Sequence, residues 1–91
     1  MQPIVEMDLS GQGLQDLELL ANKYLSKLKS LVTLNLSDNQ ISKIPKNIGE
    51  CVPNVQFLNI NNNRISPDNI LSVIDSLSFI RGLEALMINL N

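Results

Sequence analysis

The stretch from Leu31 to Ile41, LVTLNLSDNQI, constrains the fold of this chain more than any other. Leu34 and Leu36 alternate with polar residues, which predicts a short strand with one buried face. Asn39 follows where such a strand must turn, and its amide can donate to and accept from neighbouring backbone groups. If the pattern recurs, stacked copies of this amide would form a hydrogen-bonded ladder.

The pattern recurs along the whole chain. Copies with apolar residues at the same spacing begin at Ile4, Leu31, Val55 and Leu83. The amide position is filled by Gln12, Asn39, Asn63 and Asn91, with Gln12 expected to act like an asparagine on a longer stem. The successive periods are therefore 27, 24 and 28 residues. They lie in the window of roughly 20–29 residues in which each repeat supplies one strand and one helix or turn.

The chain resembles the leucine-rich-repeat family, whose motif is Leu-x-x-Leu-x-Leu-x-x-Asn-x-Leu, along essentially its whole length. The resemblance implies an α/β fold, a right-handed solenoid with a short parallel sheet on the concave face and helices and turns on the convex face. We expect a single domain over residues 1–91, with repeats at about 4–30, 31–54 and 55–82 and an incomplete repeat at 83–91. The mixed periods without cysteine-rich caps look like the intracellular members of the family.

Three connections between the strands favour helices. Leucine spacings of three and four residues predict an amphipathic helix over residues 16–27. Prolines and a glycine interrupt the second connection, so one turn of 3₁₀ or short helix is expected over residues 46–49. In the third connection Ser66 is a suitable N-cap before Pro67, and a broad apolar stripe predicts a helix over residues 67–79.

Composition narrows the function classes. The net charge is −2 and the seven basic residues are scattered, which argues against direct binding of nucleic acid through its phosphates. The sequence contains no histidine, which excludes Ser-His-Asp and Cys-His catalysis, and it offers no Cys or His pair for a metal. We therefore expect no enzymatic activity, no cofactor and no metal. Aromatic residues make up only 3% of the chain, so the core must be aliphatic.

The single cysteine, Cys51, cannot form an internal disulfide, and we expect it to be a buried structural side chain. The sequence shows neither a signal-peptide pattern nor an apolar run of about 18 residues. These features predict an intracellular, cytoplasmic protein without membrane contact. The nucleus, the cilium and the cytoskeleton stay open as alternatives.

The residues between the consensus leucines form columns across the predicted sheet and are the candidate partner-binding residues. They are Glu6, Asp8, Thr33, Asn35, Asp38, Phe57, Asn59, Asn61, Ala85, Met87 and Asn89. The first two repeats are acidic and polar, whereas the last two offer Phe57 and Met87, which suit contact with a protein partner. The alternative is that these two side chains pack on each other or on further repeats.

The expected function is non-catalytic recognition of a protein partner, or scaffolding, through the concave face. One alternative is a structural subunit that uses its uncapped solenoid ends within a large assembly. Another is a role beside nucleic acid that acts through a protein bridge. Because terminal repeats of a solenoid normally need a polar cap, we expect further repeats or a capping partner beyond Asn91.

Overall fold

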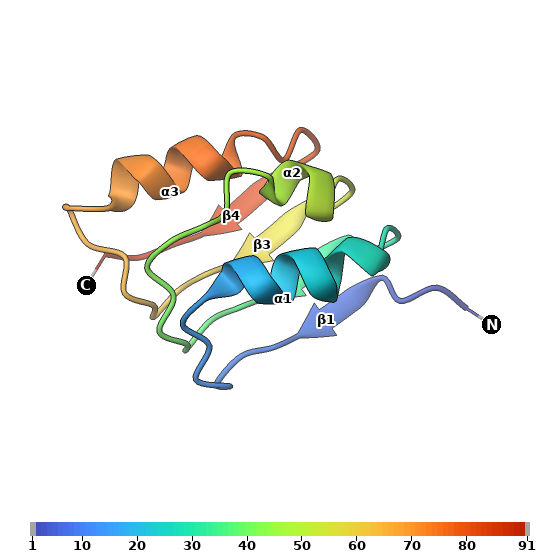
Figure 1. The fold of residues 1–91 in the computed structure, drawn as a ribbon, viewed down its shortest axis with the longest axis horizontal. Helices are drawn as coiled ribbons and strands as arrows, with labels where there is room; N and C mark the ends of the chain where they lie inside the picture. The colour runs from blue at the N-terminus through green and yellow to red at the C-terminus, as the bar shows by residue number, and fades with distance from the viewer. Residues whose placement is uncertain (1, 91) are drawn as a thin grey trace.

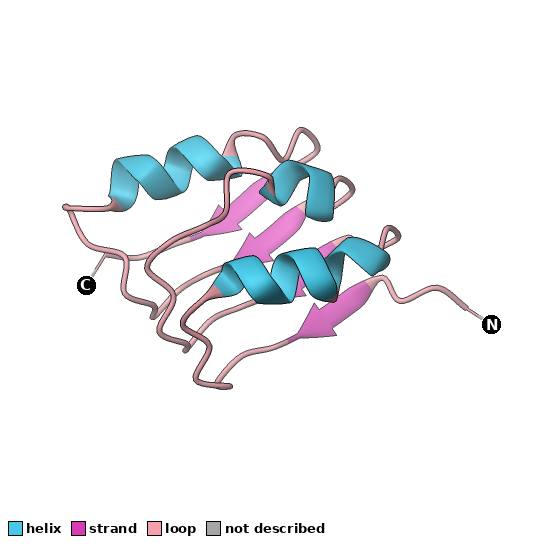
Figure 2. Ribbon diagram, in the orientation of Figure 1, coloured by secondary structure: helices cyan, strands magenta, loops and turns pink. Residues whose placement is uncertain are grey.

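The computed structural model describes residues 2–90 as a parallel sheet covered on one side by a layer of helices (Figures 1 and 2). The strands are β1 (Glu6–Asp8), β2 (Thr33–Asn35), β3 (Phe57–Asn59) and β4 (Ala85–Met87). The helices are α1 (Leu17–Lys23), the 3₁₀ helix η1 (Leu25–Lys27), α2 (Ile48–Cys51) and α3 (Ile70–Leu77). Each strand pairs with the next one in sequence, in the order β1-β2-β3-β4. This arrangement confirms the predicted α/β leucine-rich-repeat solenoid.

Alternation along each strand separates a buried face from an open one. Leu34 in β2 and Leu58 in β3 point toward the helices and are 1% and 4% exposed. Their neighbours on the same strands point the other way and are half-buried or exposed. We call the sheet face that points away from the helices the concave face, and the helix-bearing side the convex side.

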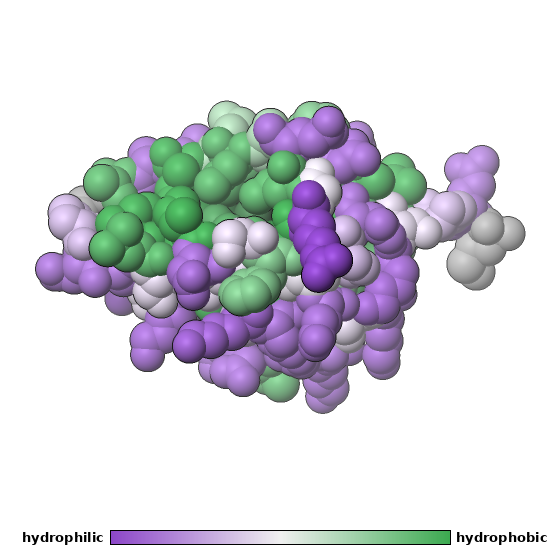
Figure 3. All heavy atoms as spheres, turned by 90° about the horizontal axis from the view of Figure 1, so that it is seen from above, coloured by the Kyte–Doolittle hydropathy of each residue, from purple (hydrophilic) through white to green (hydrophobic). Residues whose placement is uncertain are grey.

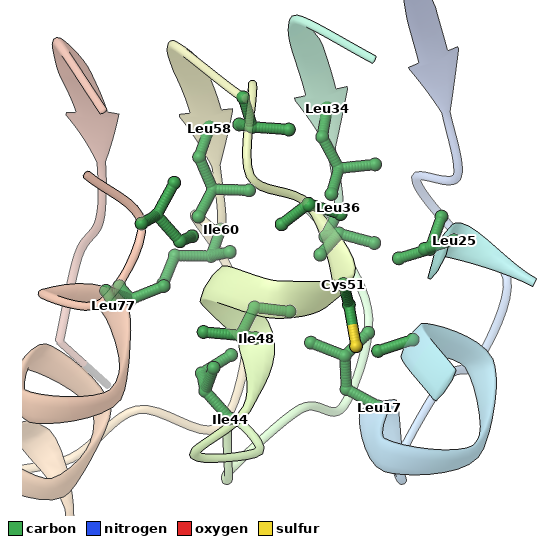
Figure 4. Close-up of a cluster of buried hydrophobic side chains, with 14 of the residues drawn as sticks. Leu17, Leu25, Leu34, Leu36, Ile44, Ile48, Cys51, Leu58, Ile60 and Leu77 are labelled. Atoms are coloured by element: carbon green, nitrogen blue, oxygen red, sulfur yellow. The ribbon is translucent and has the colours of Figure 1, made fainter. Parts of the chain in front are cut away.

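The core between sheet and helices is aliphatic apart from Cys51, as the low aromatic content predicts (Figure 4). We call the strand, turn and helical segment of one repeat a coil. The interior of the two central coils, residues 31–54 and 55–82, is closed to solvent, because residues such as Leu36, Ile41, Ile60 and Ile65 are no more than 1% exposed. All three aromatic side chains of the chain lie on the surface instead, with Tyr24, Phe57 and Phe79 between 44% and 55% exposed.

Two buried amides join the coils to one another, which confirms the predicted ladder for Asn39 and Asn63. The Asn39 Oδ1 accepts from the backbone N–H groups of Gln12 and Leu14 in the preceding coil, at 2.9 and 3.0 Å. Its Nδ2 donates to the Leu9 carbonyl in that same coil, at 2.9 Å. Asn63 repeats the arrangement one coil later. Its Oδ1 accepts from the Ile41 N–H at 3.0 Å, and its Nδ2 donates to the Leu36 carbonyl at 2.9 Å.

Gln12 differs from the two asparagines although it occupies the same repeat position. Its side chain is exposed, and its Nε2 donates only to the Ser10 carbonyl, at 3.2 Å. Asn39 and Asn63 each bind the coil before them, whereas Gln12 lies in the first coil that the structure describes and bonds only within it. Asn91, the fourth amide of the pattern, lies outside the described residues.

The helix predicted over residues 16–27 is present but divided. Asp16 is the N-cap of α1, and its carboxylate accepts from the Glu18 N–H at 2.9 Å. The chain then tightens after Lys23, because the Lys27 and Leu28 N–H groups donate to carbonyls three residues back. The last part of the predicted helix is therefore the 3₁₀ helix η1.

The other two helices begin later than predicted. The helix expected over 46–49 is α2, because the Ile48 N–H first closes a turn onto the Pro45 carbonyl. The helix expected over 67–79 is α3, which has Asn69 and not Ser66 at its N-cap position. The Asn69 Oδ1 accepts from the Ser66 N–H at 2.8 Å, while its Nδ2 donates to the Ser42 and Arg64 carbonyls. These bonds hold residues 67–69 in a turn before the helix.

The end coils are less covered than the central ones. Met7 in β1 and Leu86 in β4 correspond to Leu34 and Leu58 but are only half-buried. Figure 3 looks onto the end of the stack formed by α3 and β4, where apolar side chains gather. Leu71 on α3 is the most exposed large apolar residue of the described chain, at 81%. The C-terminal end therefore presents the same kind of surface that is buried between the central coils.

Gly49 marks a close approach between α2 and the segment after α3. A Cβ built on Gly49 would lie 2.1 Å from the Phe79 carbonyl oxygen, closer than any real Cβ contact. The clash is with backbone, so relief requires movement of α2 or of the segment around Phe79. Only glycine fits between the two without displacing one of them.

We expect Gly49→Ala to lower the free energy of unfolding by about 1–3 kcal/mol, because the strain outweighs the better helix propensity of alanine. Urea unfolding followed by circular dichroism measures the change. Gly82→Ala is the control, because its new Cβ would meet nothing nearer than 3.9 Å. Equal losses in the two variants would contradict the close approach.

Asn63→Ala should destabilise the chain more, by about 3 kcal/mol or above, because it leaves buried backbone donors and acceptors without partners. Gln12→Ala, at the same repeat position, removes one exposed hydrogen bond and should change stability by less than about 0.5 kcal/mol. Urea unfolding of both variants tests this contrast. A similar small effect at both positions would show that the amide ladder does not join the coils.

Candidate functional site

The strand register places the predicted concave-face residues in columns. Glu6 pairs with Thr33, Thr33 with Phe57, and Phe57 with Ala85. The next outward column runs through Asp8, Asn35, Asn59 and Met87. Neighbouring strands lie about 4.8 Å apart, so side chains along one column are in mutual reach. These two columns, with eight of the eleven predicted residues, match the repeat spacing, whereas Asp38, Asn61 and Asn89 lie beyond the paired strands.

The polar members of the second column shape the turns that end the strands. The side-chain oxygens of Asp8, Asn35 and Asn59 each accept from the backbone N–H two residues on, all at 3.0 Å. These are Asx turns, in which a short acceptor side chain caps the bend of the backbone. Asn35 and Asn59 are half-buried, so they present less free amide to a partner than the sequence suggests.

Asp8 differs from the two asparagines because it carries a charge. Hydrogen bonds from the Ser10 hydroxyl and then from the Ser10 N–H hold the pKa of the Asp8 carboxyl below its usual value of 3.8. Because its pKa is lowered, the exposed carboxylate stays ionised at neutral and mildly acidic pH. The stabilisation that these hydrogen bonds give to the folded chain is complete above the pKa of the unfolded state. It is lost as the pH falls through the lower pKa of the folded state.

A second polar line runs across the turns after the strands. The Asp38 carboxylate accepts from the Asn62 Nδ2 at 2.9 Å, and the Asn62 Oδ1 accepts from the Asn89 Nδ2 at 2.9 Å. Asp38 and Asn62 both have a φ of 57°, in the left-handed region, where short polar side chains are favoured over other non-glycine residues. This line joins three of the four coils and leaves the Asp38 side chain exposed.

The strands β2, β3 and β4 line a shallow apolar hollow on the concave face. Phe57 is 44% exposed and Met87 is 53% exposed, so neither is buried against the other. The hollow has a volume of about 260 Å³ and is lined by Thr33, Asn35, Phe57, Asn59, Ala85 and Met87, with β-strand atoms of Leu34 and Leu58 beneath. Small-molecule sites usually measure about 300–1,000 Å³, so this hollow suits one apolar side chain of a partner better than a bound metabolite.

Charge is segregated between the two sides of the molecule. Four of the nine acidic residues lie on a strand or within three residues of one: Glu6, Asp8, Asp38 and Glu84. Within residues 2–90, all seven lysines and arginines lie farther from the strands along the chain. The strands and their immediate flanks therefore carry only negative charge. The rest of the chain carries seven basic and five acidic residues, a net charge of +2.

A second hollow on the convex side has no counterpart in the sequence-based prediction. It has a volume of about 560 Å³ and is lined by Lys46, Asn47, Gly49, Glu50, Pro53, Phe79 and Arg81. It forms where the segment after α3 passes over α2, a contact between residues some thirty positions apart. No local pattern marks such a contact, so sequence reasoning had no signal for it. Its mixed charges distinguish it from the purely acidic concave face.

The described residues offer little reactive chemistry. In residues 2–90 no three His, Cys, Asp or Glu side chains are grouped so that they could hold a metal ion. Among the helices that the structure describes, none is both long and apolar enough to span a membrane. Cys51 is 3% exposed, as predicted, and its Sγ lies 3.7 Å from the Asn22 Oδ1. Burial raises the pKa of the Cys51 thiol, while the nearby Lys29 charge partly opposes this.

The repeat spacing, the sheet and the open concave face together define a class of repeat protein. A family model described as "Leucine rich repeat" matches residues 4–65. This match covers more than half of the chain, so the chain belongs to the leucine-rich-repeat family. Proteins of this family generally bind protein partners and are typically not enzymes, which supports a protein-interaction module.

The chain is also similar to Tsukushi from Gallus gallus. The two are 36% identical over 66 residues, which make up 70% of this chain and 17% of Tsukushi. The chain therefore spans less than a fifth of the length of that relative.

The predicted intracellular, cytoplasmic location is wrong by this comparison, because Tsukushi is a secreted leucine-rich-repeat protein of the extracellular matrix. The prediction depended on the single Cys51, on the missing cysteine-rich caps, and on finding neither a signal-peptide pattern nor a long apolar run in the given sequence. A lone thiol buried in an aliphatic core is shielded from oxidants in either kind of compartment. The cysteine count of so short a stretch therefore does not report the redox environment.

The Cys51 thiol should be inert in the folded chain. We expect a thiol reagent such as dithionitrobenzoate to react with native protein at least about a hundredfold more slowly than with protein unfolded in guanidinium, because reaction requires opening of the core. Absorbance of the released thiolate at mildly alkaline pH measures both rates. Reaction of the native chain at the unfolded rate would contradict the buried position.

Proposed function

We propose that residues 1–91 act as a single non-catalytic module that binds a protein partner through the concave face, as a recognition domain or scaffold. The contact surface would comprise the exposed members of the columns described above, with no cofactor and no direct contact with nucleic acid or membrane. The apolar hollow lined by β2, β3 and β4 is the observation that carries this proposal. It places three apolar side chains, Phe57, Ala85 and Met87, in solvent on an otherwise polar surface.

The energetics of such a surface favour a protein partner. Exposed Phe57 and Met87 side chains give up contact with water when a partner covers them, and aromatic and Met residues are enriched at interfaces. The surrounding residues are polar, so a partner would bury an apolar centre within a hydrated rim. The acidic character of the concave face opposes nucleic acid, whose phosphates would be repelled.

The backbone beneath this surface is already ordered, which lowers the entropy lost on binding. Parallel pairing joins β2, β3 and β4, and the Asx turns at Asn35 and Asn59 hold the ends of two of these strands. Contact residues built on strands keep their spacing better than residues on free loops. A partner therefore meets a surface whose geometry is set before the encounter.

Selection from a displayed library of random peptides tests the concave face. We expect peptides selected on the wild-type chain to bind the double variant Phe57→Ser, Met87→Ser at least about thirtyfold more weakly, because truncating a contact hot spot costs about 2 kcal/mol or more. Fluorescence anisotropy with labelled peptides measures the affinities.

The matched control is Tyr24→Ser, which removes an aromatic side chain of similar exposure from the convex side. It should leave the affinities unchanged. Thermal unfolding of each variant confirms that the chain is folded. If the selected peptides bind the double variant as tightly as the wild type, the concave face is not the binding surface.

We also infer that the C-terminal end of the stack receives a further leucine-rich coil, from additional repeats or from a capping partner. Leu71 and Ile74 on α3 and Leu90 after β4 are 81%, 42% and 54% exposed. Figure 3 shows apolar side chains gathered on this side of the molecule. The outer edge of β4 has no strand paired with it among the described residues. Such an edge, next to apolar surface, readily accepts another strand.

In the isolated chain, the coil available to cover this end is one from another copy. We therefore expect concentration-dependent self-association that Leu71→Gln with Ile74→Gln reduces by about tenfold or more in dissociation constant. Sedimentation velocity over a range of concentrations measures it. Leu19→Gln, an exposed leucine of α1, serves as the control. A wild-type chain that is monomeric at every concentration would contradict this second proposal.

A further inference from the structure

The charge pattern of the concave face defines its partner further, on the basis of the function proposed above. We propose that the occupant is an extended peptide segment that carries a lysine or arginine about three or four residues from a large apolar residue. The apolar residue enters the hollow beside Phe57 and Met87, and the basic residue meets the acidic side of the face.

The first argument is the sign of the charge. The acidic residues of the first two coils, Glu6, Asp8 and Asp38, are all exposed on the strand side. Within residues 2–90, no lysine or arginine lies on a strand or within three residues of one to neutralise them. Asp38 accepts only a neutral amide, from Asn62, and Asp8 accepts only from Ser10. Three carboxylates are thus left to be matched by a partner, and complementary charge at a rim speeds association and selects partners.

The second argument is the direction in which the surface changes character. Along the column Glu6, Thr33, Phe57, Ala85, side chains pass from acidic through polar to apolar. The parallel column runs from Asp8 through Asn35 and Asn59 to Met87 in the same order. Both columns cross the strands, so a segment lying along them crosses the sheet. A partner with one charged and one apolar anchor fits in a single orientation.

The spacing between the two anchors follows from the sheet. Glu6 and Phe57 are two strands apart, which corresponds to about 10 Å at a strand separation of about 4.8 Å. An extended peptide advances about 3.3 Å per residue, so three residues span that distance. The length of a lysine or arginine side chain allows a fourth. The hollow holds about 260 Å³, which suits one large apolar side chain and not two.

The chain itself supplies substitutions that remove charge without disturbing the backbone. The residue equivalent to Asp8 in the next two coils is asparagine, and Asn35 and Asn59 make the same Asx turn. The residue equivalent to Asp38 in the next coil is Asn62, which has the same φ of 57°. Asp8→Asn and Asp38→Asn therefore keep both local structures, and Glu6→Gln changes an exposed strand residue only in charge.

The test sequences the peptides selected from a displayed library of random peptides of about 12 residues, long enough to cross the whole sheet when extended. We expect enrichment of a basic residue three or four positions from a large apolar one. The triple variant Glu6→Gln, Asp8→Asn, Asp38→Asn should bind these peptides about tenfold more weakly at about 20 mM salt. The difference should shrink to about twofold at about 0.5 M salt, because salt screens exposed charges.

The matched control is Glu18→Gln, Asp68→Asn, Asp75→Asn, which changes the net charge equally but on the convex side. It should bind as the wild type does. Uncharged or acidic peptides that bind both triple variants equally, yet lose binding with Phe57→Ser and Met87→Ser, would overturn the basic partner and leave the concave-face function standing. Peptides whose affinity does not change with Phe57→Ser and Met87→Ser would overturn the proposed function and this inference with it. Failure to enrich any peptide would contradict both.

Discussion

The hydrogen bonds made by two buried asparagine amides are the interaction on which the rest of the structure depends. Parallel strands of three residues are too short to hold a sheet by their own pairing, and every turn that follows them must bury polar backbone. Asn39 and Asn63 bind backbone groups of their own coil and of the coil before it, so that one side chain closes a turn and joins two repeats. No buried side-chain nitrogen or oxygen among the described residues is left without a partner. Because these buried polar atoms all have hydrogen-bond partners, an aliphatic core can form directly beneath the strands.

Because these amides join the backbone, the side chains on the concave face of the strands contribute little to holding the fold together. Where the second column does contribute, through the Asx turns, the fold requires an acceptor oxygen and is indifferent to its charge. Asp8 and Asn35 perform the same backbone task while presenting different surfaces. The first column has no such task, and it therefore varies from Glu6 to Phe57 to Ala85 without any change in register. The residues of the proposed recognition surface can therefore differ in charge and size from coil to coil while the fold is kept.

The repeat spacing was enough to predict the strands, their register and the columns along them, because each depends on residues a fixed distance apart. The low aromatic content predicted the aliphatic core. The features that were missed depend on encounters that no period encodes. Asn69 reaches back to three backbone groups, and Gly49 makes room for the carbonyl of Phe79. Gln12 was expected to match Asn39, but its side chain is exposed and bonds only to the Ser10 carbonyl of its own coil. The location was mispredicted from a cysteine count, a property that reflects the whole protein and not one stretch of it.

The difference in burial between central and end coils has a consequence for how binding and order are coupled. Coils in such a stack contact only their neighbours, so we expect the end coils to fray before the central ones open. Phe57 stands on β3, within the sealed centre, whereas Met87 stands on β4, whose buried-side residue Leu86 is only half-covered. The side of the hollow formed by β3 is therefore expected to stay ordered when the side formed by β4 frays. A ligand that touches both walls must hold the last coil closed, so its affinity and the order of β4 rise together.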